Sequence, residues 1–375
     1  MTIREVTAKS ILRKYKRLNT WFLSYYGMNL YRACAHNCAY CDGRTEQYRV
    51  EGKFNEDVTV KANAVDVLSH ELDPARKRTP FKKSYVMLGG GVGDCYQPVE
   101  AQYGLTSGVL HLLHAHNLPV HILTKSDMVT RDIDILANIN QAGKAIVSFS
   151  FCTVDDSLSR FLEPGTPLPS QRVKAIYELK QRGIPCGMFI LPIVPFVTDK
   201  PELIRSAFDI GSELDIDFMV FGGMTLKRGR QKDYFLSKLK KNFPKLLPKY
   251  ENIYQESRWG EFSQAYADRL NQTIYRISRD FKIPLRIPTR LFADVLTMND
   301  RVVTILEHLD YFQKLRNQKS PFGYAAFRIS KLSDPIAAWR DKLRSLKGVG
   351  PLTESIILEI LDTGTCKKYE ILMKK

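Results

Sequence analysis

The stretch Cys34-Ala35-His36-Asn37-Cys38-Ala39-Tyr40-Cys41 places three cysteines at a CxxxCxxC spacing on one short segment. Such a segment can fold as a loop with its three sulfurs pointing inward around a metal centre. Thiolates are soft ligands that select iron–sulfur clusters or zinc. Zinc takes four ligands, usually as two spaced pairs, and no second pair follows nearby. We therefore predict a 4Fe–4S cluster on Cys34, Cys38 and Cys41, with one iron left open for a substrate or cofactor.

This motif, with Tyr40 before its last cysteine, resembles the signature of the radical S-adenosylmethionine (SAM) superfamily. In that superfamily the open iron binds the amino and carboxylate groups of SAM. An injected electron then splits SAM into methionine and a 5′-deoxyadenosyl radical. The flanking sequences resemble the spore photoproduct lyase-like branch, also called DNA repair photolyase-like, and they are Tyr31-Arg32-Ala33, Asp42-Gly43-Arg44 and Asp94-Cys95-Tyr96-Gln97-Pro98-Val99-Glu100.

The fold follows from an alternation of short apolar runs with helical periods, punctuated by Gly or Pro. Strands are expected at residues 29–32, 85–90, 120–124, 145–151, 187–191 and 218–221, and helices at 60–72, 99–116, 131–141, 170–182 and 201–214. Six such units predict a partial (β/α)6 TIM-like barrel, in agreement with the resemblance. We divide the chain into a basic and aromatic N-terminal segment (1–28), the barrel (29–225) and a basic, mostly helical C-terminal extension (226–375). Within the first segment, residues 11–17 are expected to be helical.

Chemistry in barrels of this type lies at the C-terminal ends of the strands. By resemblance, Gly90 and Gly91 lie beside the methionine end of SAM, in a loop whose glycines allow close backbone approach. Lys125, after the third strand, pairs with the SAM carboxylate, and Ser148 touches SAM. The resemblance also assigns Tyr40, Asp94 and Arg172 to the cofactor site, Arg172 following a Glu163-Pro164 loop.

The catalytic residues predicted in the same loop are Cys95 and Tyr96. In the lyase a cysteine at the end of the second strand returns a hydrogen atom to the product radical. That place falls near Gly91 in this sequence. We therefore nominate Cys95 as the hydrogen donor and keep Cys152, just past the fourth strand, as the reserve.

The charge lies at the two ends of the chain. The net charge is +16, and residues 226–375 carry 30 Lys and Arg against 16 Asp and Glu, while residues 18–225 carry 20 against 23. A basic extension beside a near-neutral core favours a polyanionic partner, here DNA. Lys227-Arg228-Gly229-Arg230 and the turn Leu346-Lys347-Gly348-Val349-Gly350-Pro351 are the candidate contacts. The turn resembles the hairpin of a helix-hairpin-helix motif, although a plain Gly-Pro loop fits equally.

The substrate implied by the resemblance is a thymine dimer lesion in DNA, with an external flavodoxin or ferredoxin as electron donor. The motif is equally compatible with a radical SAM enzyme that acts on RNA or a peptide. The other alternative is a nucleic-acid binding protein with a structural iron–sulfur cluster. No apolar run approaches a membrane span of about 18 residues, and the seven cysteines do not form a disulfide framework. We therefore expect a cytoplasmic protein without a membrane partner.

Overall fold

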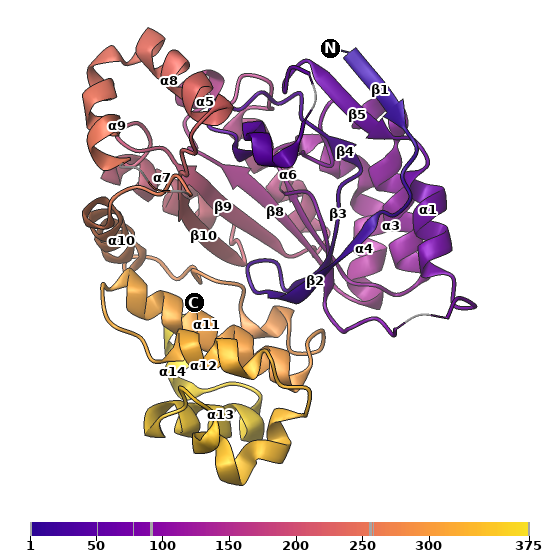
Figure 1. Ribbon diagram of the computed structural model, residues 1–375, viewed down its shortest axis with the longest axis vertical. Coiled ribbons are helices and arrows are strands. Elements are labelled where there is room, and N and C mark those ends of the chain that lie inside the picture. Colours follow the sequence, from indigo (N-terminus) through magenta and orange to yellow (C-terminus); the bar gives the residue numbers. More distant parts are fainter. Residues whose placement is uncertain are drawn as a thin grey trace.

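The computed structural model describes residues 2–50, 52–77, 79–90, 93–254, 257 and 259–373. Its centre is a seven-stranded sheet in the order β10-β9-β8-β7-β6-β3-β2 (Figure 1). Neighbouring strands are parallel from β3 through to β10, and β2 pairs antiparallel with β3. The strands are β2 (Leu12–Asn19), β3 (Ser24–Met28), β6 (Tyr85–Leu88), β7 (Val120–Thr124), β8 (Ala145–Phe151), β9 (Cys186–Ile193) and β10 (Phe218–Gly223).

Helices connect the parallel strands, as parallel pairing requires. They are α1 (Ala64–Leu72), α2 (Glu100–Tyr103), α3 (Leu105–Ala115), η3 (Asp127–Asp132), α4 (Ile133–Ala142), α5 (Asp156–Leu162), α6 (Pro169–Gln181) and α7 (Pro201–Glu213). Every residue of β8 is buried, which is the pattern of a strand covered on both faces. The predicted partial (β/α)6 barrel is confirmed.

The first barrel strand was predicted at the wrong place. It is β3, Ser24–Met28, and not residues 29–32. All five residues of β3 are buried and pair with β6. Tyr31–Arg32 instead forms the short strand β4 in a separate three-stranded sheet with β1 (Thr2–Val6) and β5 (Asp57–Lys61). The proposed boundary at residue 28 thus coincides with the end of a barrel strand.

The expectation of a helix at residues 11–17 was also wrong, because this stretch belongs to β2. Pairing with β3 overrides the local pattern, as strand formation depends on context. Tyr15 covers Gly27 of β3 so closely that a side chain at Gly27 would overlap its ring. β2 forms the edge of the sheet, where charged side chains are tolerated because one side of the strand remains open.

The C-terminal region is mostly helical, as predicted. Its helices are α8 (Arg230–Asn242), η4 (Pro244–Leu246), α9 (Leu247–Ile253), α10 (Gln264–Ser278), η5 (Thr289–Leu291), α11 (Met298–Leu315), α12 (Phe322–Ile329), η6 (Ile336–Ser345), α13 (Pro351–Thr363) and α14 (Lys367–Met373). α11 docks on the β2–β3 hairpin, where the buried Tyr25 hydroxyl donates to Asp300 at 2.5 Å and Thr20 donates to Glu307. No helix in the described part of the chain is long and apolar enough to cross a membrane.

Candidate active site

The three motif cysteines line a single cavity. Cys34 and Cys38 are buried and Cys41 is half-buried, and all three are free thiols. The cavity lies where the loop after β4 meets the C-terminal ends of the barrel strands. Its other lining residues are His36, Gly90, Gly93, Asp94, Leu123, Thr124, Lys125 and Ser150.

Two barrel segments hold the cysteine loop in place. The Gln97 side chain accepts from the Ala35 amide at 3.0 Å and donates to the Ala33 carbonyl at 3.1 Å. From the loop after α5, the Gly165 amide donates to the His36 carbonyl at 3.0 Å, and a Cβ on Gly165 would lie 2.5 Å from the Ala35 oxygen. Backbone contacts therefore fix the loop independently of any bound group.

Helix α8 covers the outer side of this loop. The buried Gln231 amide donates to the Tyr40 carbonyl at 2.9 Å, and the Tyr234 hydroxyl donates to Asn37 at 3.0 Å. The Arg44 guanidinium lies 3.6 Å from the centroid of the Tyr234 ring. Our sequence reasoning missed Gln231. No local signal could have identified it, because 191 positions separate it from Tyr40.

Two basic residues that we had nominated for DNA also contact this region. The Lys227 ammonium pairs with Asp42 at 2.8 Å, and the Arg230 amide donates to Glu46 at 2.9 Å. Lys227 is thus an internal partner of the segment that follows the cysteines. Reversing its charge would therefore disturb this segment directly.

The thiols fit an iron–sulfur cluster better than a single ion. Among the described residues, no three His, Cys, Asp or Glu side chains close on one metal ion. The three sulfurs nevertheless share one cavity, as ligands of separate irons in one cluster would. Burial raises the pKa of Cys38 to about 12 and also raises that of Cys34 and Cys41. Cationic iron would supply the charge that thiolates in this buried site need.

A buried carboxylate, Glu163, organises the strand end opposite the cysteines. One of its oxygens accepts from the Lys125 ammonium at 2.8 Å and from the Tyr40 hydroxyl, and the other accepts from the Arg172 guanidinium at 2.5 Å. Burial works to raise the pKa of Glu163, but the Arg172 and Lys125 charges outweigh it and hold the pKa far below the usual range. Glu163 is therefore an anion between two cations.

Lys125 has one loosely held donor. Its ammonium carries three N–H groups. Glu163 at 2.8 Å and the Ser150 hydroxyl at 2.9 Å accept two of them, and the Ser150 carbonyl accepts the third over a longer distance, 3.4 Å. The Lys125 side chain also lines the cavity. Arg172, by contrast, is fully buried behind Glu163 and does not line the cavity, so it acts as a positioning residue.

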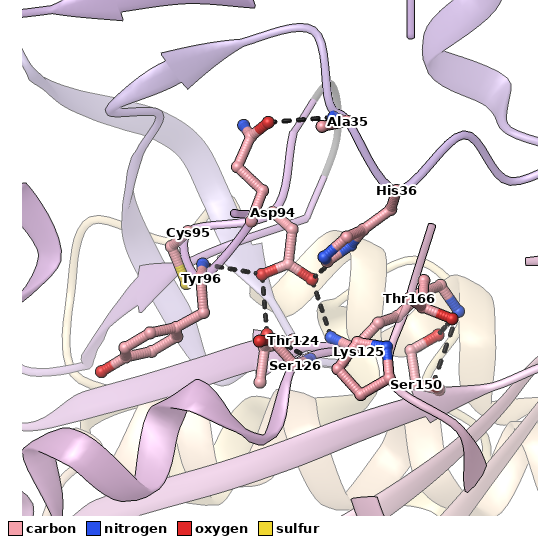
Figure 2. Close-up of polar contacts among 12 residues, drawn as sticks. Ala35, His36, Asp94, Cys95, Tyr96, Thr124, Lys125, Ser126, Ser150 and Thr166 are labelled. Atoms are coloured by element: carbon pink, nitrogen blue, oxygen red, sulfur yellow. Dashed lines mark hydrogen bonds and ion pairs between the residues drawn. The ribbon is translucent and has the colours of Figure 1, made fainter. Parts of the chain in front are cut away.

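Asp94 is saturated by protein donors (Figure 2). Its carboxylate accepts from the Tyr96 amide at 2.8 Å, the Thr124 hydroxyl at 2.7 Å and the Lys125 amide at 2.7 Å. His36, from the cysteine motif, lies 3.5 Å from the same carboxylate. Asp94 thus joins the loops after β6 and β7 to the cysteine loop.

The glycine loop after β6 requires left-handed backbone. Gly89 and Gly90 have φ of 83° and 87°, a region that side chains rarely adopt. A side chain on Gly89 would also overlap the Leu123 carbonyl. Gly90 lines the cavity, as predicted for the cofactor loop. Gly91 lies outside the described residues.

Ser150 occupies the cavity wall where we had expected Ser148. The Ser148 hydroxyl lies deeper in the barrel, 2.8 Å from Nε2 of His121, whose Nδ1 lies 3.2 Å from the Phe22 carbonyl. Because the carbonyl can only accept, His121 carries its proton on Nδ1 and Ser148 donates to Nε2. Ser150 is two residues nearer the C-terminal end of β8 and contacts Lys125.

Cys95 and Tyr96 do not line the cavity of the three cysteines. Cys95 borders a smaller neighbouring cavity with Tyr31 and Gly89. The Tyr96 hydroxyl donates to Asp132 at 2.9 Å, on the far side of the loop from the cysteines. The reserve candidate, Cys152, is also buried outside the cavity lining. The roles of these residues remain predictions.

Comparison with known proteins places this site in a family. Residues 28–207 match the model of the radical SAM superfamily. An uncharacterized protein of Mycobacterium tuberculosis is 30% identical over 293 residues, which cover 75% of this chain and 83% of that protein. An uncharacterized protein of Methanocaldococcus jannaschii is 28% identical over 251 residues, covering 66% and 85%.

Solved structures agree with the fold. The structure of spore photoproduct lyase complexed with dinucleoside spore photoproduct superposes with a TM-score of 0.56 at 16% identity, covering 75% of this chain and 79% of that one. The CxxxCxxC loop, the barrel and the family match agree with one another. The chain belongs to the radical SAM superfamily.

Proposed function

We propose that this protein is a radical SAM enzyme that acts on a base lesion in DNA. The observation that carries the proposal is one cavity that bears three cysteine thiols on one wall and Lys125 on another. Cys34, Cys38 and Cys41 would hold a 4Fe–4S cluster. Lys125, Gly90 and Ser150 would face the SAM bound at its open iron.

When bound and reduced, the cluster and SAM supply a 5′-deoxyadenosyl radical that abstracts hydrogen. The protein's own part is to position and to shield. The N–H of Lys125 that makes the long bond to the Ser150 carbonyl would turn to the SAM carboxylate, while Glu163 and the Ser150 hydroxyl hold the ammonium in place. The buried cysteine loop would keep water from the cofactors, since α8 covers its outer side.

DNA is the substrate class that the likeness to spore photoproduct lyase supports. A damaged base costs less to extrude than an intact one, and extrusion would bring it to the barrel mouth. The turn at Gly348 has the backbone that a hairpin needs, because Gly348 has a φ of 95° and α13 begins just after Gly350. A side chain on Gly350 would meet open space, so a phosphate could approach its amide. RNA and peptides are the competing substrate classes, and a cytoplasmic flavodoxin or ferredoxin is the proposed electron source.

The test is anaerobic reconstitution followed by two measurements. Iron and sulfide content should correspond to one 4Fe–4S cluster, and it should be lost when Cys34, Cys38 or Cys41 is replaced by Ala. Cys186→Ala is the matched control, since Cys186 is also a free, buried cysteine but begins β9, at the opposite end of the barrel. Full clusters in all three motif variants would refute the assignment.

The second measurement addresses the reaction. Reduced protein with SAM and ultraviolet-irradiated DNA should release 5′-deoxyadenosine and restore thymines, and RNA and peptide competitors should not inhibit. SAM cleavage would exclude a purely structural cluster. SAM cleavage with RNA or peptide, but not with DNA, would reject the DNA proposal and keep the enzyme class.

A further inference from the structure

We propose that the backbone of duplex DNA lies along a basic rail formed by the edge strand β2, the end of α12 and the turn before α13. The rail consists of Arg13, Arg17, Arg328, Lys331 and Lys347. The inference rests on the proposed DNA substrate and names the surface that holds it. Arg13 and Arg17 lie more than 300 positions from Arg328, Lys331 and Lys347 in the sequence, and the fold brings the two groups together.

Direct contacts join the three parts of the rail. The Arg17 guanidinium of β2 lies 4.6 Å from the centroid of the Phe327 ring in α12, and the Lys331 ammonium lies 4.3 Å from the same ring. Phe327 stacks on Tyr324 with 6.3 Å between ring centroids. Tyr324 packs against the turn. A Cβ atom on Gly348 would lie only 2.5 Å from the Tyr324 ring. The strand, helix and turn therefore form one continuous surface.

The three stretches of chain that form this surface are basic. Residues 12–19, 316–331 and 342–350 contain 4, 4 and 3 Lys and Arg, respectively, and no Asp or Glu. All five rail residues are exposed. Arg344, in the third stretch, pairs with Glu354 and is therefore left out of the rail. Acidic side chains of neighbouring helices lie beside these stretches, Asp310 against Gly323 and Glu354 against Arg344, but the Lys and Arg residues outnumber them. A surplus of clustered, exposed cations is the electrostatic footprint of a surface that binds a polyanion.

The rail leads toward the candidate active site. β2 runs antiparallel to β3, with Leu12 opposite Met28 at the end nearest the cavity and Asn19 opposite Ser24 at the other end. Arg13 pairs with Gly27, next to Met28 at the C-terminal end of β3. Arg13 therefore marks the end of the rail nearest the barrel mouth.

The dimensions suit a duplex. Eight strand residues rise about 3.3 Å each, so β2 spans roughly 25 Å. One strand of DNA carries a phosphate for about every 3.4 Å of helix axis, and the length of β2 thus corresponds to roughly seven base-pair steps. Figure 1 shows the C-terminal helices beyond one end of β2 and the small sheet near its other end, so the rail runs from the helices toward the barrel mouth.

The experiment measures binding of a 20-base-pair duplex to the full-length protein by fluorescence anisotropy, without SAM, at several salt concentrations. One variant carries Arg13→Glu and Arg17→Glu, and a second carries Lys331→Glu and Lys347→Glu. The matched control carries Lys240→Glu and Lys241→Glu, which change the net charge equally on exposed positions of α8. Each rail variant should weaken binding by about tenfold or more. The log–log salt slope should become shallower by roughly 0.9 per lost phosphate contact.

The outcomes separate the possibilities. Losses in both rail variants with a small change in the control would support the rail. An equal loss of DNA affinity in the control would show a general effect of net charge. Unchanged DNA affinity in the Arg13→Glu and Arg17→Glu variant would show that β2 does not contact DNA. Either result overturns the proposal. Binding of RNA duplex alone would also overturn it. If the Arg13→Glu and Arg17→Glu variant does not fold, the Lys331→Glu and Lys347→Glu variant still tests the proposal, because both of its changes lie outside the sheet. The proposed function is tested separately. It fails if the reduced protein releases no 5′-deoxyadenosine from SAM, whatever the DNA-binding assay shows.

Discussion

Replacing Glu163 by Gln tests whether one buried carboxylate holds the cofactor side of the barrel together. Glu163 and Arg172 are fully buried, and the Lys125 side chain is only 13% exposed. Glutamine keeps the shape but removes the charge, so Arg172 and Lys125 remain as two buried cations without their anion. Removing one partner of a buried ion pair typically costs about 3–5 kcal/mol. We expect a loss of that size in the free energy of unfolding.

The assay is urea unfolding of the cluster-free protein, followed by far-ultraviolet circular dichroism. A second variant, Glu163→Gln with Arg172→Met, removes both the anion and its most deeply buried cation. Because the unpaired charge causes most of the cost, this double variant should be more stable than Glu163→Gln alone. Glu163→Asp, which retains the charge on a shorter side chain, should lose less.

The reasoning would be refuted by an unfolding midpoint of Glu163→Gln equal to that of the unmodified protein. It would also fail if the double variant were less stable than the single one, since the cost would then come from lost packing. SAM affinity of the reconstituted protein provides a functional readout. Glu163→Gln should weaken it, because Lys125 loses the partner that orients its ammonium.

Three further predictions follow from the site and the barrel. Lys125→Ala should weaken SAM binding by roughly 10- to 150-fold, the equivalent of about 1.5–3 kcal/mol for a charged hydrogen bond, as measured by calorimetry without oxygen; unchanged affinity would remove Lys125 from the site. Cys95→Ala should still cleave SAM but should divert the product radical to side products seen by mass spectrometry, and a normal product at the normal rate would disprove the hydrogen-donor role. Burial lowers the pKa of His121 to about 4, so the unfolded chain binds a proton that the folded chain does not as the pH falls below about 6.5. Stability should therefore fall by up to about 1.4 kcal/mol per pH unit between pH 6 and 4, and His121→Gln should reduce this slope; an identical slope would show that other groups cause it.

Much of the barrel could be predicted because its signals are local. The run 145–151 is apolar throughout, and β8 has those bounds. The cysteine spacing places three thiols on one loop whatever the rest of the chain does, and the strand-end rule located Lys125 and Gly90 on the same cavity. These inferences need only the period of a strand or helix and the fact that parallel strands end at one edge.

The errors arose where a partner distant in sequence decides the structure. Residues 11–17 are basic with a helical appearance, yet they form β2 because β3 offers backbone partners. Ser148 and Ser150 share one face of β8, and only the depth of the barrel decides which of them reaches the cavity. Lys227 belongs to a basic run, but Asp42, 185 positions away, fixes it beside the cysteine loop.

By itself, the sequence determined the spacing of the three cysteines and located five of the six predicted barrel strands, because both depend on local pattern along the chain. Only the tertiary structure decided that Glu163 is an anion shared by Lys125 and Arg172. It alone decided that α8 covers the cysteine loop and that Arg17 meets Phe327. The physical reason is that burial, charge pairing and ring stacking depend on distances in space, which residues far apart in sequence acquire only when the chain has folded.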